Sequence, residues 1–421
     1  MLLKMVLVKQ KVMAPKVNNI RKSVLKAFEQ INVERLDLSG LTVGITAGSR
    51  GISSIVEVLT IIIDMVKKAG GYPVIIPAMG SHGETTEEGQ CNILASLGIT
   101  EKSMSVPIRG SLETVLLGET TNNIPVYCNL NTKKVDRIIL VNRVKPHTDF
   151  SGKIESGICK MLAVGLGGIR GALTTHQYSL IQGYEETITS IAAYMLKKIP
   201  VLFAIGILEN WKGETAGIEG MLPEEVITKE QGLLKRAKKL LVKLPFHFIN
   251  ILILDEIGKN ISGTSMDTKV VGRIMVKGQK EPKAPIIDRI VVLKLTPESH
   301  GNAIGVGLAD IITLRLFKSI DIEATSLNSI KSMSPEQGRV PCVVKNDYDA
   351  IKSALLTLGA VDLNKVKVVY IKNTSKLELF AVSEGMIDEV AKNSQLEIIG
   401  KPEEIRFDVE GNLLNFKGKL L

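Results

Sequence analysis

One stretch of the sequence brings together several residue types that can do chemistry. Residues 141–176 contain two of the five histidines of the chain, His147 and His176, with Lys160 between them and glycines close by. Histidine exchanges protons near neutral pH and binds metal ions, and lysine can form covalent links. Glycine lets the backbone approach a ligand closely but weakens a scaffold. This composition indicates a functional site.

A third histidine, His82, lies in the motif GSHG at 80–83. The motif follows an apolar run at 73–77, which is typical of a buried strand, and precedes a helix expected at 87–98. The imidazole is therefore expected at the mouth of a sheet, where an ordinary pKa of about 6.5 suits proton transfer. An incidental histidine in a glycine turn is the alternative interpretation.

The other candidates also have structural interpretations. Pro146 restricts the backbone before His147 and so fixes that side chain at a strand end, but an exposed loop histidine is the alternative. An apolar setting such as that of Lys160 can make a lysine nucleophilic. A helix lysine that extends toward solvent is the alternative. His176 follows two threonines and is either a metal ligand or a polar residue at a helix start.

Short runs of Val and Ile that alternate with helix-like segments predict the elements that must position these residues. Such alternation is typical of an α/β fold whose sheet is mostly parallel and covered on both faces. Ligands bind outside the carboxyl ends of the strands in such sheets. The site is therefore expected in the loops 48–51, 80–83 and 143–150, which follow strands expected at 41–47, 73–77 and 136–142.

The length of 421 residues predicts two domains. A basic helix expected at 230–243 separates an N-terminal, cofactor-binding catalytic domain at 1–240 from a C-terminal α/β domain at 245–421. We expect the active site in the cleft between them. The second domain contains glycine-rich loops around Gly263 and His300, to which the sequence assigns no role. Its strands are expected at 248–254, 288–296 and 365–371.

Bulk composition narrows the class of protein. The 53 basic and 44 acidic residues are interspersed, so the net charge of +9 indicates local binding of phosphate or carboxylate groups, not of nucleic acid. No apolar run approaches the roughly 20 residues of a membrane span, and the start of the chain, with its lysines, is expected to form a strand and not a signal peptide. The four cysteines show no paired spacing. We therefore expect a cytoplasmic protein with no membrane or nucleic-acid partner.

The motifs around these residues resemble those of the lactate racemase family, whose enzymes use a nickel-pincer nucleotide. The resemblance runs from about 41 to 217. It is carried by GSHG at 80–83, Pro-His at 146–147, the Ser-Gly-x-x-Lys motif at 156–160 and the histidine at 176. The family implies an α/β enzyme with its site on these motifs.

The resemblance implies a role for each of these residues. Lys160 would carry the cofactor, a pyridinium bis-thio acid mononucleotide with nickel, through a thioamide bond. His176 would coordinate the nickel, and His82 and His147 would be the acid/base pair. Further cofactor contacts are expected at Arg50, Gly80, Ser81, Lys145 and Ser156, and substrate-carboxylate contacts at Arg50, Lys145 or Arg273.

These roles predict an isomerase, a racemase or epimerase of a lactate-like 2-hydroxy acid or sugar acid, that acts by transient hydride transfer to the bound nucleotide. Two acid/base residues suit inversion, because a base must serve each hand of the substrate. Cofactor-maturation proteins are the partners that the resemblance implies. Two alternatives stay open. One is a metal-assisted lyase or hydrolase in which His82, His147 and His176 share an ion, and the other is a non-catalytic nucleotide- or phosphate-binding protein.

Overall fold

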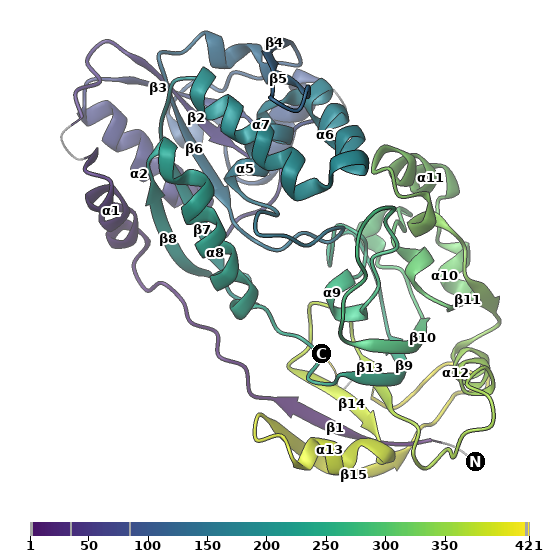
Figure 1. Ribbon diagram of the computed structural model, residues 1–421. Helices are drawn as coiled ribbons and strands as arrows, with labels where there is room; N and C mark the ends of the chain where they lie inside the picture. The colour runs from purple at the N-terminus through teal and green to yellow at the C-terminus, as the bar shows by residue number, and fades with distance from the viewer. Residues whose placement is uncertain (1–2, 34–35, 84–85, 417–419, 421) are drawn as a thin grey trace. The chain divides into compact units, whose positions relative to one another are not determined.

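The chain folds into two compact units, each built on a mostly parallel or mixed β-sheet with helices packed against it (Figure 1). The α/β fold class expected from the sequence is confirmed. Each unit has its own hydrophobic core. The residues that the computed structural model describes are 3–33, 36–83, 86–416 and 420.

The two units do not follow the chain as consecutive halves. The first thirteen residues belong to the C-terminal unit, although they were expected in the domain at 1–240. Hydrophobic periodicity shows where a strand lies along the chain, but it does not show which sheet that strand joins. The N-terminal unit consists of Ala14–His147 and Ser151–Leu241, and the C-terminal unit of Met1–Met13, Thr148–Phe150 and Val242–Leu421.

The N-terminal unit contains a five-stranded sheet. In spatial order its strands are β3 (Tyr72–Pro77), β2 (Thr42–Ala47), β6 (Arg137–Arg143), β7 (Val201–Glu209) and β8 (Thr215–Met221). The first four strands are parallel, and β8 is antiparallel to β7. The expected strands at 41–47, 73–77 and 136–142 are thus present, to within one residue at either end. A separate hairpin joins β4 (Thr114–Glu119) to β5 (Pro125–Asn129).

Helices cover both faces of this sheet. Alternate strand residues, such as Ile45, Val141 and Ile205, share a core with α1 (Ile20–Gln30) and α2 (Ile55–Lys68). On the other face, Leu233 packs onto the sheet at a glycine, and the helices there include α5 (Ile158–Lys160) and α8 (Val226–Leu240). The remaining helices of the unit are α3 (Glu87–Ser96), α4 (Glu101–Met104), α6 (Gly168–Gln182) and α7 (Tyr184–Lys198).

The C-terminal unit contains an eight-stranded mixed sheet. In spatial order its strands are β12 (Cys342–Val344), β11 (Ile311–Thr313), β10 (Ile286–Val292), β9 (Phe248–Leu254), β13 (Val368–Ile371), β14 (Leu379–Ser383), β1 (Lys4–Gln10) and β15 (Leu396–Glu404). The strands from β12 to β13 are parallel, and the last three pair antiparallel. The helices of this unit are α9 (Thr268–Val271), α10 (Leu314–Lys318), α11 (Ile322–Lys331), α12 (Asp347–Leu356) and α13 (Ile387–Ala391).

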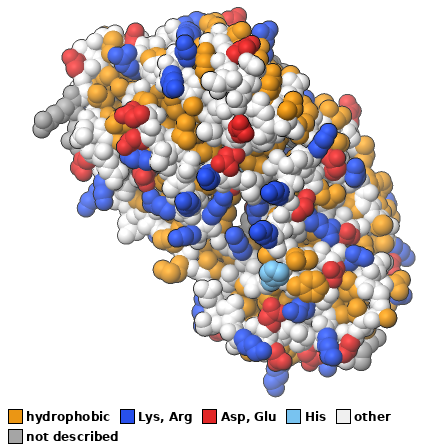
Figure 2. Space-filling model, in the orientation of Figure 1, with side chains coloured by type: hydrophobic (Ala, Val, Ile, Leu, Met, Phe, Trp, Pro, Cys, Tyr) orange, Lys and Arg blue, Asp and Glu red, His pale blue; other side chains and the backbone are white. Residues whose placement is uncertain are grey.

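Three general features bear on the class of protein. Acidic side chains lie among the basic ones on the visible face of both units (Figure 2). Within the described ranges, no helix has the length and apolar character needed to cross a membrane. The four cysteines are free thiols, and two of them, Cys128 and Cys159, are buried.

Candidate active site

The loops that follow β2, β3 and β6 meet at one edge of the N-terminal sheet, because these strands are parallel neighbours. Ser49, after β2, is hydrogen-bonded to His82, after β3, with 2.6 Å between Oγ and Nδ1. Arg50 lies close enough to Arg143, the last residue of β6, for the two charges to interact. A hydrogen bond thus joins two of the three loops that the sequence singled out, and the charge of Arg143 at the third acts on Arg50.

His147 and Lys160 are in direct contact. The Lys160 Nζ atom lies 2.5 Å from Nε2 of His147. The main chains of Lys145 and Ser156 pair on either side of the intervening loop, with N–O distances of 2.8 and 3.2 Å. This pairing turns the chain back on itself and explains how residues thirteen positions apart come together.

A buried carboxylate holds the same loop. The side chain of Glu155 accepts hydrogen bonds from the main-chain N–H groups of His147, at 2.7 Å, and of Gly152, at 3.0 Å. Glu155 also forms an ion pair with Lys238 of α8, whose Nζ lies 2.6 Å from Oε1. Glu155 is only 1% exposed, so these contacts are shielded from water. The sequence did not indicate this residue, because its partners are main-chain groups and a lysine from a helix far along the chain.

A π-helical segment, Met161–Leu166, directly follows Lys160. Such segments are frequent at functional sites. The N–H group of Gly80 donates to the carbonyl of Gly165 at 3.0 Å, and a Cβ atom at Gly80 would lie 3.0 Å from another main-chain oxygen of this segment. Gly80 also has a φ of +63°, which favours glycine. The GSHG loop therefore packs closely against the chain just beyond Lys160.

His176 lies on α6 in a partly buried position. Its Nδ1 atom is 3.3 Å from the hydroxyl of Tyr184 at the start of α7. Desolvation, followed by the positive charge of Lys160, lowers the pKa of His176 to about 4. The imidazole is therefore neutral near pH 7, which is the form that binds a metal ion.

Arg50 and Arg143 have different surroundings. Arg143 pairs with Glu209, whose other carboxylate oxygen accepts the N–H of Ser53 at 2.6 Å. None of the ion pairs among residues 3–33, 36–83, 86–416 and 420 involves Arg50. Arg50 reaches the surface, yet protein atoms around its guanidinium and the charge of Arg143 lower its pKa. The guanidinium of Arg50 thus has no acidic partner among these ion pairs.

Arg273 lies in the C-terminal unit, where its guanidinium is fully engaged. It forms an ion pair with Asp310 at 2.9 Å and donates to the carbonyls of Leu308, Ile287 and Asp288 at 3.0 to 3.2 Å. These contacts tie the start of β10 to the chain before β11. They give Arg273 a structural role that the sequence did not indicate.

The structure does not favour a shared metal ion. In the part of the chain that is described, no three His, Cys, Asp or Glu side chains are placed to hold an ion together. The alternative in which three histidines share one ion thus has no counterpart among these residues.

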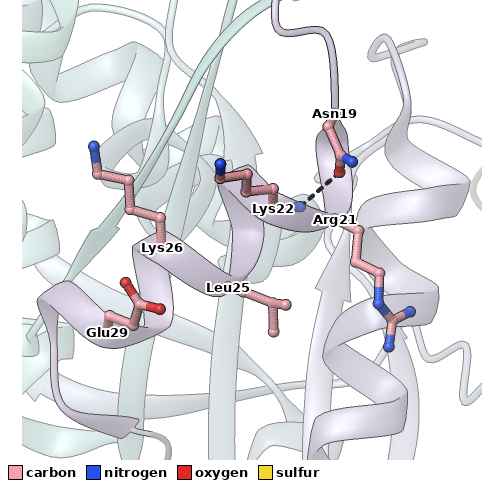
Figure 3. Close-up of a pocket in the computed structure, with 6 residues that line it drawn as sticks. All are labelled: Asn19, Arg21, Lys22, Leu25, Lys26 and Glu29. Atoms are coloured by element: carbon pink, nitrogen blue, oxygen red, sulfur yellow. Dashed lines mark hydrogen bonds between the residues drawn. The ribbon is translucent and has the colours of Figure 1, made fainter.

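A surface hollow lies along α1 and contains none of the site residues expected from the sequence (Figure 3). Its side chains come from α1 and the residue that caps it, where Asn19 accepts a hydrogen bond from the N–H of Lys22 at 2.8 Å. The hollow therefore belongs to the outer surface of the helix. Its lining residues are Asn19, Arg21, Lys22, Leu25, Lys26 and Glu29.

The fold and the site together define an α/β protein with an ionisable histidine and lysine cluster at the carboxyl edge of a parallel sheet, as in many enzymes. Residues 16–187 match the family model of the lactate racemase N-terminal domain. The matched segment contains His82, His147, Lys160 and His176. Similarity to this domain suggests an isomerase of the racemase or epimerase type.

Solved structures with low sequence identity resemble the whole chain. A protein from Thermotoga maritima is 14% identical, with a TM-score of 0.51, and the match covers 86% of this chain and 98% of that one. The lactate racemase apoprotein from Thermoanaerobacterium thermosaccharolyticum is 12% identical, with a TM-score of 0.49 and 92% of each chain covered. None of the curated protein sequences compared with the chain matches it. The first of these structures supports the fold.

Proposed function

We propose that this protein is a racemase or epimerase of a 2-hydroxy acid, either lactate-like or a sugar acid, that carries a nickel-pincer nucleotide on Lys160. The observation that carries the proposal is the 2.5 Å contact between His147 and Lys160, within the segment that matches the lactate racemase N-terminal domain. The neutral His176, whose pKa the charge of Lys160 helps to lower, adds a ligand for a metal ion.

The residues of the site fit such a nucleotide. His176 would coordinate the nickel without first releasing a proton, and Tyr184 restrains its ring through Nδ1. A pincer group brings its own donor atoms, so the imidazole of His176 would be sufficient as the ligand from the protein. Lys160 would hold the nucleotide through a thioamide bond. Further contacts to the nucleotide would come from Arg50, Gly80, Ser81, Lys145 and Ser156.

The side chains of the site would supply binding and proton transfer. The chemistry that the bound nucleotide supplies is reversible hydride transfer, which side chains lack. His82 and His147 would take the proton of the substrate hydroxyl and return it, one for each hand of the substrate. Ser49 holds the ring of His82, and Glu155 fixes the main chain at His147. Arg50 would bind the carboxylate of the substrate.

The mass of the intact protein tests the proposal. The protein should be produced in the cytoplasm of a cell that makes the nucleotide, because we propose that cofactor-maturation proteins load it. We expect a covalent adduct that peptide mapping places on Lys160. An unmodified chain with a conventional bound metal ion would instead support a lyase or hydrolase. Incubation with enantiopure lactate, malate and sugar acids, followed by loss of optical purity, then identifies the substrate.

A further inference from the structure

A glutamate on α8 lies buried beneath the helix start that leads to Lys160. The side chain of Glu230 has no exposed surface, and its Oε2 atom accepts the main-chain N–H of Cys159 at 2.9 Å. Burying a carboxyl group is unfavourable unless its oxygens find partners. A glutamate at this position therefore calls for a reason beyond packing.

The carboxyl group of Glu230 satisfies a main-chain N–H group that α5 leaves unpaired, while its Oε1 atom is buried without a hydrogen-bond partner. The first N–H groups of a helix have no partner within it. Burial raises the pKa of Glu230 to about 7, while the N–H groups of Cys159 and Ile158 and the Cys159 thiol lower it. Of these groups, the N–H of Cys159 forms a hydrogen bond with the carboxylate. Glu230 thus serves as the cap of α5 from a separate helix.

Gly157, the residue before α5, is held from two sides. Its carbonyl accepts a hydrogen bond from Nδ2 of Asn142, in β6, at 2.8 Å. A Cβ atom at Gly157 would lie only 2.4 Å from Oε1 of Glu230, so a side chain there would displace the glutamate. Asn142 of the sheet and Glu230 of α8 therefore both contact the chain at the point where α5 begins.

We infer that Glu230 is a positioning residue, which acts through the backbone to fix where Lys160 presents its amine to His147. Lys160 follows Cys159 directly, so a rotation of the helix start would move the lysine out of its 2.5 Å contact. The inference rests on the proposed function in one respect, because the amine matters as the attachment point of the nucleotide. The positioning itself is a property of the chain and is measurable without the nucleotide.

Amide hydrogen exchange of the full-length apoprotein tests the capping role. In Glu230→Ala, we expect the amide of Cys159 to exchange about tenfold faster, because its acceptor is lost. Glu230→Gln should show a smaller change, since its side-chain oxygen still accepts one N–H group. Glu224→Ala, which removes an exposed acid just before α8, is the matched control and should leave exchange unchanged. Wild-type exchange rates in Glu230→Ala would overturn the inference.

Chemical labelling tests the effect on the lysine. The apoprotein is treated with an amine-acetylating reagent, and peptide mass spectrometry gives the labelling rate of Lys160 relative to the exposed Lys153. We expect this ratio to change by about threefold or more in Glu230→Ala and to return toward the wild-type value in Glu230→Gln. The same ratio in all variants would contradict the inference. Should Glu230→Ala not fold, as judged by circular dichroism, Gly157→Ala takes its place in the labelling experiment, because a Cβ atom there displaces the Glu230 carboxyl group.

Gly157 provides an independent test by double substitution. Gly157→Ala alone should alter the Lys160 labelling ratio, because its Cβ collides with the Glu230 carboxyl group. In the Glu230→Ala background the same substitution should have little further effect, since the colliding group is gone. Equal effects in both backgrounds would contradict the inference. A wild-type protein that shows the expected exchange and labelling but carries no adduct would refute the proposed function and leave the positioning role intact.

Discussion

Each unit has a sheet with parallel strands, and the two units differ in the side chains that lie at the carboxyl edge of those strands. In the N-terminal unit, the segments beyond the parallel strands place His82 against Ser49 and His147 against Lys160, which are groups that can exchange protons. In the C-terminal unit, charges at the same kind of edge neutralise each other. Asp255, after β9, pairs with Lys294, after β10, at 2.9 Å. A parallel sheet therefore offers a place for chemistry, and the choice of side chains decides whether it is used.

Protonation states sharpen this difference. Burial raises the pKa of Tyr370 in the C-terminal unit, and Asp255 adds to the effect. A phenol is already protonated at neutral pH, so this shift does not change its protonation state. In the N-terminal unit, the pKa of His176 is lowered to about 4 and that of Glu230 raised to about 7. These two shifts favour the neutral forms of both groups near working pH. Such groups cluster at functional sites more often than in structural networks.

Removal of Lys160 should have the largest effect. Lys160→Ala should abolish the covalent adduct and all racemase activity, because the attachment point is gone. Intact mass and an assay of optical purity measure the two losses, and circular dichroism should show a native fold. Lys153→Ala, an exposed lysine of the same loop, is the control and should retain both. The full adduct mass on Lys160→Ala would refute the assignment.

The two proposed acid/base histidines should matter next. His82→Ala and His147→Ala should each lose about 10²–10⁴-fold in racemisation, the usual contribution of general acid–base catalysis. Single-turnover oxidation of one enantiomer should fall sharply in one variant and much less in the other. Near wild-type rates in both variants would mean that the histidines are structural. Equal losses for both hands would refute the paired assignment.

Loss of the metal should follow from His176→Ala. We expect most of the bound nickel to be missing from protein purified from loading cells, because His176 is the one protein ligand that we assign. Elemental analysis measures the nickel content. His300→Ala, in the C-terminal unit, is the control from the region without assigned chemistry and should bind nickel normally. Equal nickel content in wild type and His176→Ala would refute the assignment of His176 as the metal ligand, and with it this difference between the two units.

Glu230 should make stability depend on pH in a predictable direction. Because its pKa is raised from 4.5 to about 7 on folding, the folded protein binds this proton more tightly than the unfolded chain. Its contribution to the free energy of unfolding is therefore present below about pH 4.5 and is lost as the pH rises toward 7, by up to about 3 kcal/mol. Glu230→Gln should lack this dependence, so its stability relative to wild type should increase between about pH 5 and pH 8 in urea titrations. A constant difference across this range, as expected for the control Glu224→Gln, would contradict the prediction.

The smallest effect is expected in the C-terminal unit. Arg273→Ala should lower the free energy of unfolding by about 1–2 kcal/mol, because it breaks a partly exposed ion pair and several main-chain hydrogen bonds. The adduct on Lys160 should form as in wild type. A raised KM for the substrate without loss of stability would instead favour the substrate-binding role that the sequence suggested for Arg273.

Local features of the N-terminal unit could be predicted from the sequence. The runs at 41–47 and 73–77 are short and rich in Val and Ile, and their loops carry glycine, so both the strands and the loops after them could be placed. Parallel neighbours then bring such loops to one edge, which anticipated the contact between the loops of Ser49 and His82.

Contacts between distant residues could not be predicted in this way. Glu230 sits in a lysine-rich helix that is typical of a solvated surface, and its partner Cys159 lies 71 positions away. Arg273 looked like a substrate ligand because arginine binds carboxylates, but here the carboxylate is Asp310 of the protein itself. In each case the partner is set by tertiary packing, which periodicity and motif spacing do not report.

The pairing of β1 between β14 and β15 has a consequence for synthesis on the ribosome. Lys4 is synthesised long before Glu404, which is its partner in the sheet. All residues of the N-terminal unit lie within 14–241, so this unit can fold while the rest of the chain is still being made. Until β14 and β15 have been made, β1 has no partner strands, and such a strand is prone to wrong pairing. A nascent chain of this protein therefore carries β1 without its partner strands until β14 and β15 have been made, and a chaperone that shields β1 would act during that interval.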